Sequence, residues 1–511
     1  MPDLGDASSP HVAIVVDHPQ RDLPGIVLTA IELARRGVVC RLVPFNLQER
    51  EIWAFEPDFV LFNFLRRSNE RFGRELHEAG IALGVLDTEG AIWPDPDEYV
   101  SLLWKDTALL REVRCVCMWG PLLAEHLVTR GIFTREQVAI TGCPRFDLYA
   151  RPWRDLNEDA AEALRRHTRT ILINTNFSIS NPRFTTRDKC VAMHRTVLGY
   201  SEDDVSRMVE AEDIAIRETV RLAEKLAEKY STVDVVIRPH PFENPAPYEA
   251  VAAARPNVRV NDGESIQAAI FSACAVIQRS CTTALEAGLA GVATFSPQWI
   301  PAPMLMPAAE AVSVPCSSFS ELTAHLSAIL GGSYRTSEAT RQAIADVVHD
   351  CCFAADGLSH RRVTAVVFGA LGSSRRVDSD RCRRALYGLD SANGHPLARA
   401  ARYLRHGLQL PPEWSFTQLR EVPAIDWTRS RKHFDVTRVQ AIVDRAQQCG
   451  TSTAPAAAVD GVVVSAANGT ADGWRAHARY SVTIAPRWRP QVSAGVQHRV
   501  TSTTDVQVVS R

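Results

Sequence analysis

Short apolar runs alternate with segments of helical periodicity through the first 150 residues of the chain. The apolar runs fall at residues 11–17, 38–43, 58–63, 81–87, 114–119 and 137–142. Runs that are apolar over nearly their whole length are typical of strands buried on both faces of a parallel sheet. Helices are predicted between them over 23–36 and 68–79. This alternation predicts a parallel α/β domain over residues 10–150.

A second series of the same kind follows a short linker at Pro152 and Trp153. Its predicted strands lie at 170–176, 233–238, 258–260, 275–279 and 292–295, the last being the final strand of the series. A long helix is predicted over 211–229 and a further helix over 282–290. We expect a second Rossmann-like domain over 165–340, facing the first across a cleft. Ligands of open α/β sheets bind beyond the carboxyl ends of the strands, so the residues that follow each strand are the candidates for function.

The pattern changes beyond residue 340. Helices are predicted over 341–351, 381–389 and 436–448, so residues 341–450 are interpreted as a helical extension. Residues 451–511 contain weakly alternating Val, Ser and Thr segments without a clear core. We assign no fold to this tail and interpret it as a possible flexible segment.

Composition and charge exclude several classes of protein. The 511 residues are 46% hydrophobic and 23% charged, which is typical of a folded protein with two or three domains. The net charge of -2 argues against a nucleic-acid binder. No apolar run reaches the length of a membrane span and the first residues lack the features of a signal peptide, so we expect a cytoplasmic location. The twelve cysteines lack metal-ligand spacing and are expected to be reduced and mostly buried.

The first candidate site follows the predicted strand 233–238. Arg238 and His240 alternate with two prolines there, and a guanidinium and an imidazole N–H can hold a phosphate. His-Pro pairs also occur at His18 and His395. Only the pair at 240 is interpreted as combining a strand end with an adjacent arginine, and a structural turn is the alternative.

A second candidate lies at the start of the predicted helix 282–290. Ser280, Thr282 and Thr283 place hydroxyl groups beside helix N-terminal amides, an arrangement that suits a phosphate. Glu286, one turn further on, is placed to accept ribose hydroxyls. The alternative is an ordinary helix cap with a solvated Glu286.

Carboxylates follow a strand in the first domain. Asp87 and Glu89 flank a turn that ends at Gly90, and such a carboxylate can act as a general base or as a nucleophile. A capping turn is the alternative. Asp95 and Asp97 match an Asp-x-Asp metal motif, but a proline-rich turn explains them equally well, and we assign no metal and no cofactor. The fingerprints of nucleoside triphosphatases and NAD enzymes are missing from the sequence.

These motifs resemble a known set of enzymes. An acidic segment ending in glycine, a His-Pro pair and a Ser/Thr segment look like bacterial sialyltransferases and Kdo transferases, which use CMP-sugars on the two-domain GT-B fold. In that comparison Glu89 matches the catalytic acid, with Thr88 in place of the usual acidic neighbour. His240 and Pro241 match the nucleotide-phosphate motif, and Cys281 interrupts the usual Ser/Thr pair.

A second resemblance comes from Gly142-Cys-Pro-Arg-Phe-Asp147. It is similar to segments of capsule-type glycosyltransferases and of CDP-glycerol glycerophosphotransferases. With Asn174, Asn176 and Arg145 added to the binding set, residues 10 to 370 look like bacterial surface-carbohydrate biosynthesis proteins.

The resemblances imply a GT-B-like α/β protein with a helical C-terminal extension. They imply a metal-independent glycosyltransferase of surface polysaccharide assembly, for capsule or lipopolysaccharide. The expected partners are a nucleotide-sugar donor, with a CMP-activated acidic sugar favoured, and a glycan or lipid-linked acceptor. Glu89 is the first choice of catalytic carboxylate and Asp87 the second. The alternatives are a CDP-polyol phosphotransferase, a nucleotide-sugar epimerase of the same fold and a non-catalytic assembly scaffold.

The charge is unevenly distributed along the chain. Residues 371–511 carry a net charge of +9 and the first 370 residues carry -11. The basic residues could dock on the inner face of an anionic membrane, and a solvated protein surface is the alternative. The candidates for docking are Arg381, Arg383, Arg384, Arg399, Arg402 and Arg405.

Overall fold

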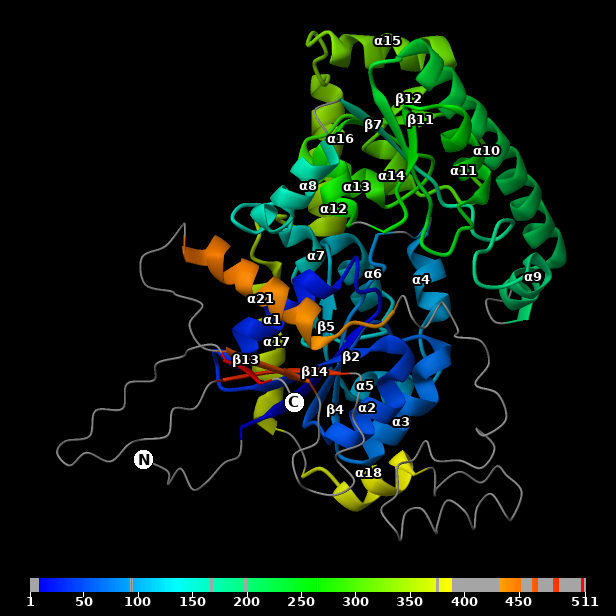
Figure 1. The fold of residues 1–511 in the computed structure, drawn as a ribbon. Helices are drawn as coiled ribbons and strands as arrows, with labels where there is room; N and C mark the ends of the chain where they lie inside the picture. Colours follow the sequence, from blue (N-terminus) through cyan, green and yellow to red (C-terminus); the bar gives the residue numbers. More distant parts are fainter. Residues whose placement is uncertain are drawn as a thin grey trace, which may run out of the picture.

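The protein contains two α/β domains stacked one above the other, as seen in the computed structural model (Figure 1). The structure describes residues 9–91, 93, 95–165, 169–196, 200–263, 265–373, 376–387, 432–451, 462–466, 481–486 and 507–509. The sheets and the crossing helices have the GT-B arrangement of two Rossmann-like domains, which confirms the predicted fold class.

The sheet of the first domain has a parallel body. Its strands are β1 (His11–Val16), β2 (Val39–Pro44), β3 (Phe59–Phe62), β4 (Ala82–Leu86), β5 (Val113–Met118) and β6 (Val138–Ile140). They are arranged in the order β2-β1-β3-β4-β5-β6. The order reverses between β1 and β3, so the residues that follow these two strands face the position where such sheets bind ligands.

The sheet of the second domain is parallel throughout. Its strands are β7 (Thr170–Asn174), β8 (Asp234–Arg238), β9 (Val258–Val260), β10 (Ala273–Ile277), β11 (Thr294–Pro297) and β12 (Val314–Cys316). The order β9-β8-β7-β10-β11-β12 is that of a Rossmann fold, with its reversal between β7 and β10. β12 corrects the expectation that the strand at 292–295 is the last one. Its three residues are too short to give a periodic signal.

Helices cover both faces of each sheet. In the first domain they are α1 (Leu23–Ala34), α2 (Gln48–Phe55), α3 (Glu70–Glu78), α4 (Pro96–Leu102), α5 (Thr107–Glu112), α6 (Pro121–Thr129) and α7 (Pro144–Asp147). The next series is α8 (Glu158–Arg165), α9 (Arg187–Thr196), α10 (Glu202–Lys229), α11 (Ala246–Ala254), α12 (Ile266–Ser272), α13 (Thr283–Ala290), α14 (Pro307–Ala311) and α15 (Phe319–Leu330). The last described helices are α16 (Glu338–Cys352), α17 (Ser359–Ala370), α18 (Ser379–Leu386) and α21 (Val436–Thr451).

Two consecutive helices carry the chain back from the second domain to the first. α16 packs against α13 and α14 and also against α6, while α17 packs against α1 (Figure 1). α6 and α16 approach closely, because a Cβ atom at Gly120 would lie 2.2 Å from the carbonyl oxygen of Asp350. The three helices predicted beyond residue 340 are confirmed as α16, α18 and α21. α17 and α21 bury their apolar residues in the core of the first domain.

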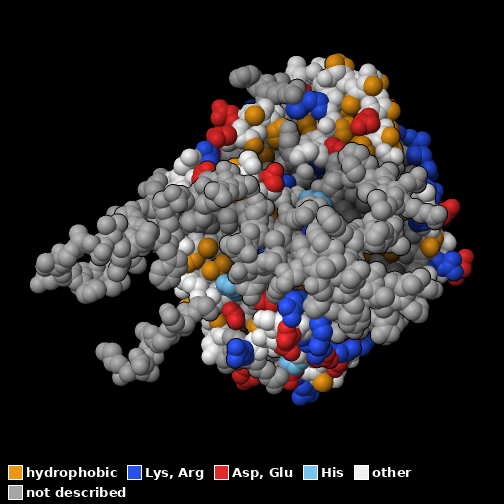
Figure 2. Space-filling view, turned by 60° about the horizontal axis from the view of Figure 1, so that its bottom comes forward, with side chains coloured by type: hydrophobic (Ala, Val, Ile, Leu, Met, Phe, Trp, Pro, Cys, Tyr) orange, Lys and Arg blue, Asp and Glu red, His pale blue; other side chains and the backbone are white. Residues whose placement is uncertain are grey.

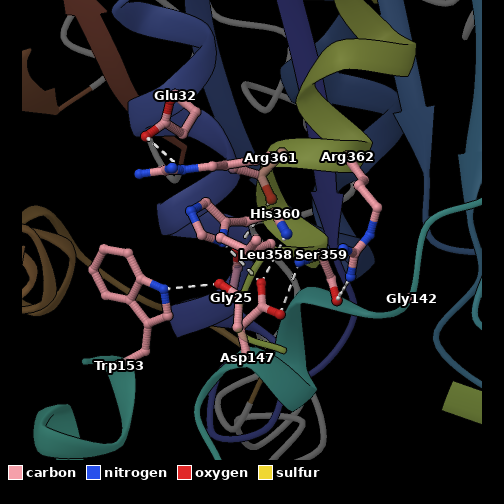
Figure 3. A network of polar contacts seen from close by, with 12 residues as sticks. Gly25, Glu32, Gly142, Asp147, Trp153, Leu358, Ser359, His360, Arg361 and Arg362 are labelled. Carbon is pink, nitrogen blue, oxygen red and sulfur yellow. Dashed lines mark hydrogen bonds and ion pairs between the residues drawn. The ribbon is translucent and has the colours of Figure 1, made fainter. Parts of the chain in front are cut away.

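The segment 142–147 holds the start of α17 by hydrogen bonds, at the point where the chain returns to the first domain. Both carboxylate oxygens of Asp147 accept backbone N–H groups at the start of α17, from Ser359 at 2.9 Å and from His360 at 2.8 Å. The His360 Nδ1 atom lies 2.8 Å from the same carboxylate (Figure 3). Gly142 has a φ of +74°, and a Cβ atom there would lie 2.5 Å from the Ser359 hydroxyl. The glycine and the aspartate of this motif therefore have a structural explanation.

The C-terminal tail contributes to the first sheet. β14 (Val482–Pro486) pairs antiparallel with β2, and β13 (Val462–Ala466) and β15 (Gln507–Val509) extend the same edge. The sequence led to no fold assignment for residues 451–511, and the structure places these three strands of that segment at the edge of the first sheet. Their alternation is too weak to identify them as strands from local pattern alone. The partner of β14 lies more than 400 residues away along the chain, so no hairpin signal marks the pairing either.

Candidate functional site

A cavity of about 420 Å³ lies between the two domains, at the carboxyl ends of both sheets. The first domain lines it with residues that follow β1 to β4, and the second with residues that follow β7, β8 and β10. The polar lining residues are Asp17, His18, Gln20, Arg21, Glu89, Asn174, Thr175, Arg238, His240, Thr282, Thr283, Glu286 and Lys432. Seven of the eleven predicted site residues are in this set.

Arg238 and His240 form one wall of the cavity. Burial lowers the pKa of His240 from 6.5 to about 3, and the charges of His18, Arg21 and Arg238 act in the same direction. The imidazole is therefore neutral near pH 7. Its Nδ1 atom accepts the backbone N–H of Phe242 at 3.3 Å, so the proton sits on Nε2. His240 thus offers a neutral N–H donor.

A buried carboxylate holds the loop that carries His240. Glu243 accepts the backbone N–H of His240 at 3.3 Å, the hydroxyl of Thr175 at 2.6 Å and the hydroxyl of Tyr248 at 2.5 Å. Burial raises the pKa of Glu243, and these hydrogen bonds oppose the increase. The loops after β7 and β8 are therefore joined by a single side chain.

The N-terminus of α13 opens onto the cavity. Thr282 occupies the cap position, but its side chain makes no capping hydrogen bond. The hydroxyl of Thr283 accepts a hydrogen bond from the Asn174 side-chain amide at 3.1 Å, which joins the ends of β7 and β10. The Oδ1 atom of Asn174 is buried without a hydrogen-bond partner. This wall combines hydroxyl groups, helix N-terminal amides and an unused acceptor, a set that suits a ligand with phosphate and hydroxyl groups.

Glu286 lies one turn into α13 and also lines the cavity. Its Oε1 atom is 3.5 Å from the Nε atom of Arg145, and both of these buried atoms lack hydrogen-bond partners. Burial raises the pKa of Glu286, while Arg145, Arg21 and Arg238 lower it. Arg145 itself does not line the cavity. It lies over the rings of Trp119 and Phe146, and its contact with Glu286 makes it a supporting residue.

The first domain contributes a group that sequence reasoning missed. Asp17, His18 and Arg21 follow β1, and Arg21 binds Asp17 at 2.9 Å. The His18-Pro19 pair also follows a strand, and Arg21 lies three residues further along. The carboxyl-end rule applied to β1 would have found it. Burial, followed by the charge of Arg21, lowers the pKa of His18 to about 3.

The two predicted carboxylates after β4 have different surroundings. Asp87 is buried, accepts the Tyr99 hydroxyl at 2.9 Å and the Glu89 backbone N–H at 2.8 Å, and does not line the cavity. Glu89 lines the cavity with its side chain 36% exposed. Arg66 contacts both carboxylates, at 3.6 Å from Asp87 and 3.5 Å from Glu89. Burial raises the pKa of Glu89, and Arg66 and Arg21 oppose the increase.

Two further predicted residues lie away from the cavity lining. The hydroxyl and backbone N–H of Ser280 both bind Glu310, at 3.1 and 3.0 Å, and its φ of 52° turns the backbone before α13. Asn176 follows β7 but lies beyond the lining residues. Among the described residues, no group of three or more His, Cys, Asp or Glu side chains is arranged to hold a metal ion.

Comparisons with known proteins give structural neighbours only, since no protein-family model and no curated sequence matches the chain. A putative UDP-N-acetylglucosamine 2-epimerase from Listeria monocytogenes is 12% identical, with a TM-score of 0.45 over 72% of this chain and 98% of that one. UDP-GlcNAc 2-epimerase from Neisseria meningitidis, bound to UDP-GlcNAc, is also 12% identical, with a TM-score of 0.43 over 70% and 100%.

A third neighbour is the wall teichoic acid polymerase TagF, which is 10% identical, with a TM-score of 0.43 over 70% of this chain and 88% of that one. The assignment of the fold rests on the two sheets and the crossing helices themselves.

Part of the basic C-terminal region can be placed. Arg381 pairs with Glu78 and Arg383 with Asp380, while Arg399, Arg402 and Arg405 lie outside the described residues. On the face shown in Figure 2, basic and acidic side chains are interspersed. None of the described helices is long and apolar enough to cross a membrane. Docking at a membrane surface stays a prediction.

Proposed function

We propose that the chain is a GT-B glycosyltransferase of bacterial surface-polysaccharide assembly. It transfers a sugar from a nucleotide-sugar, with a CMP-activated acidic sugar favoured, to a glycan or lipid-linked acceptor. The observation that carries this proposal is the composition of the interdomain cavity. Hydrogen-bond donors that suit a phosphate line this cavity from the second domain. An accessible carboxylate, that of Glu89, lines the same cavity from the first domain.

The second domain holds the donor in this proposal. The guanidinium of Arg238, the Nε2–H of His240 and the hydroxyls of Thr282 and Thr283 surround the phosphate, and the N-terminus of α13 adds its dipole. The Oε1 atom of Glu286 and the Oδ1 atom of Asn174 accept hydrogen bonds from hydroxyl groups of the nucleoside. These two buried oxygens otherwise have no hydrogen-bond partner. Arg145 keeps Glu286 in place.

Glu89 acts as the general base. The acceptor hydroxyl loses its proton to the carboxylate as its oxygen forms a bond to the anomeric carbon. The bond between that carbon and the phosphate oxygen breaks, and its electron pair remains on the nucleotide phosphate. Arg238 and the α13 N-terminus stabilise the negative charge that develops there. The burial that raises the Glu89 pKa makes this carboxylate a stronger base than an ordinary glutamate.

The test begins with nucleotide binding. Calorimetry of the full chain with CMP, CDP and UDP identifies the nucleotide, and His240→Ala should weaken that binding by about tenfold or more, because a charge-assisted hydrogen bond is lost. His349→Ala is the matched control, since His349 is exposed on α16 and is not among the residues that line the cavity. If His240→Ala bound the nucleotide as tightly as the wild type, the phosphate would not bind at the wall formed by Arg238 and His240.

Product analysis then separates the candidate reactions. Release of CMP and free sugar from a CMP-sugar supports the glycosyltransferase. Release of CMP from CDP-glycerol would assign the cavity to a phosphotransferase, and interconversion of UDP-sugars without acceptor would assign it to an epimerase. A chain that is folded but neither binds nor turns over any of these compounds would be a scaffold.

A further inference from the structure

One cation of the cavity comes from neither Rossmann domain. Lys432 precedes α21, in the segment that follows the two domains along the chain, and it lines the interdomain cavity. Phe434 beside it is buried in the core of the first domain, together with Val439 and Val443 of α21. This anchoring gives Lys432 a fixed position at the cavity.

Lys432 lies where both domains meet. Its Nζ atom is 2.7 Å from the Oδ1 atom of Asp17, and its side chain is only 13% exposed. The same ammonium lies 4.7 Å from the ring centre of Phe45, after β2, and 5.7 Å from that of Phe242, after β8. The residue therefore contacts the first domain, the second domain and the cavity at once.

The contact with Asp17 does not use the full donor capacity of Lys432. An ammonium group has three N–H donors. Asp17 accepts one of them, but the same carboxylate also binds Arg21 through its other oxygen, at 2.9 Å. The two aromatic rings attract the positive charge but offer only π faces as acceptors. An anionic group entering the cavity beside Phe45 and Phe242 would gain a charge-assisted hydrogen bond.

We infer that Lys432 is a specificity-determining residue that binds the carboxylate of an acidic sugar in the donor. This inference rests on the proposed function, in which the wall around Arg238 and His240 holds the phosphate. The same cavity is lined by Glu89, the proposed base, and by Lys432, so a sugar attached to that phosphate shares the cavity with both side chains. The C-terminal segment thereby selects acidic over neutral sugars.

The experiment compares two ligands that differ in the presence of the acidic sugar. The full-length chain is titrated with CMP and with CMP-N-acetylneuraminate, and the ratio of the two dissociation constants is measured. CMP-N-acetylneuraminate should bind at least about tenfold more tightly than CMP to the wild type, from one charge-assisted hydrogen bond. Lys432→Met should remove this preference, with the affinity for CMP unchanged within about twofold.

Two control variants isolate the contact. Lys432→Arg keeps the charge and should keep the preference. Lys105→Met removes a positive charge from an exposed position on the first domain and should change neither affinity. Circular dichroism and the melting temperature check that each variant is folded.

The outcomes distinguish this inference from the proposed function. If the nucleotides bind but Lys432→Met keeps the preference, or the wild type has none, the role of Lys432 is refuted and the proposed function stands. If Lys432→Met weakens CMP and CMP-N-acetylneuraminate equally, the lysine binds phosphate and the inference is also overturned. If the wild type binds no nucleotide at all, the proposed function fails together with it.

Discussion

The buried contact between Asp147 and the start of α17 allows a stability prediction to be worked out atom by atom. Asp147 is fully buried, and its carboxylate accepts three hydrogen bonds, two at one oxygen and one at the other (Figure 3). In Asp147→Asn the side chain can turn its carbonyl oxygen toward the two donors of His360. The amide NH₂ then faces the Ser359 N–H, so one hydrogen bond is replaced by two opposed donors.

The magnitude follows from these losses. A hydrogen bond to a charged group contributes about 1.5–3 kcal/mol, and loss of the charge at a helix N-terminus adds about 0.3–1 kcal/mol. We therefore expect Asp147→Asn to lower the free energy of unfolding by about 2–4 kcal/mol. For a domain of this size, that lowers the melting temperature by roughly 4–16 °C. Asp147→Ala loses all three bonds and should be less stable still.

The assay is differential scanning calorimetry of the full chain, with Asp346→Asn as the control. Asp346 is exposed on α16, and its contact with Gln342 is also exposed, so the control should melt within about 2 °C of wild type. Nucleotide binding at 20 °C should be retained in Asp147→Asn, because Asp147 does not line the cavity. A melting temperature for Asp147→Asn equal to that of Asp346→Asn would show that the return crossing does not depend on this carboxylate.

Three more predictions concern chemistry, pH and packing. Glu89→Gln should lower turnover by about a hundredfold or more at unchanged nucleotide affinity. It should also abolish the rise of kcat/KM with pH that titration of the Glu89 carboxyl produces. Near-normal turnover would show that Glu89 is not the catalytic base. Burial raises the pKa of Glu212 from 4.5 to about 7. Between these two pH values the folded chain holds a proton that the unfolded chain has released, so the free energy of unfolding falls as the pH rises from 4.5 to about 7. Glu212→Gln keeps a carbonyl oxygen for the two backbone N–H groups that share Oε2, so its melting temperature relative to wild type should be higher at pH 8 than at pH 5; an equal difference at both pH values would contradict this. Gly120→Ala places a Cβ atom 2.2 Å from a backbone oxygen of α16, and should destabilise the chain by about 1–3 kcal/mol in thermal melts, whereas Gly369→Ala, with open space around its Cβ position, should not.

The sequence by itself determined the two α/β series and the side of the sheets on which function is expected. Buried parallel strands are apolar along their whole length, so β1, β4, β7 and β8 are visible as local patterns. Because all parallel strands of a sheet end at the same edge, the residues that follow them were predicted to meet. His240, which follows β8, and Thr282, which follows β10 of the same sheet, do line one cavity for this reason.

Only the tertiary structure decided which polar side chains enter the cavity. Ser280 and Thr282 are two residues apart, but contact with Glu310 directs Ser280 away while Thr282 lines the cavity. Lys432 reaches Asp17 across more than 400 residues of chain, and β14 finds β2 over a similar separation. Periodicity and propensity report the burial of a residue among its sequence neighbours. They carry no signal for contacts between distant segments, which are selected by packing and charge once the domains have formed.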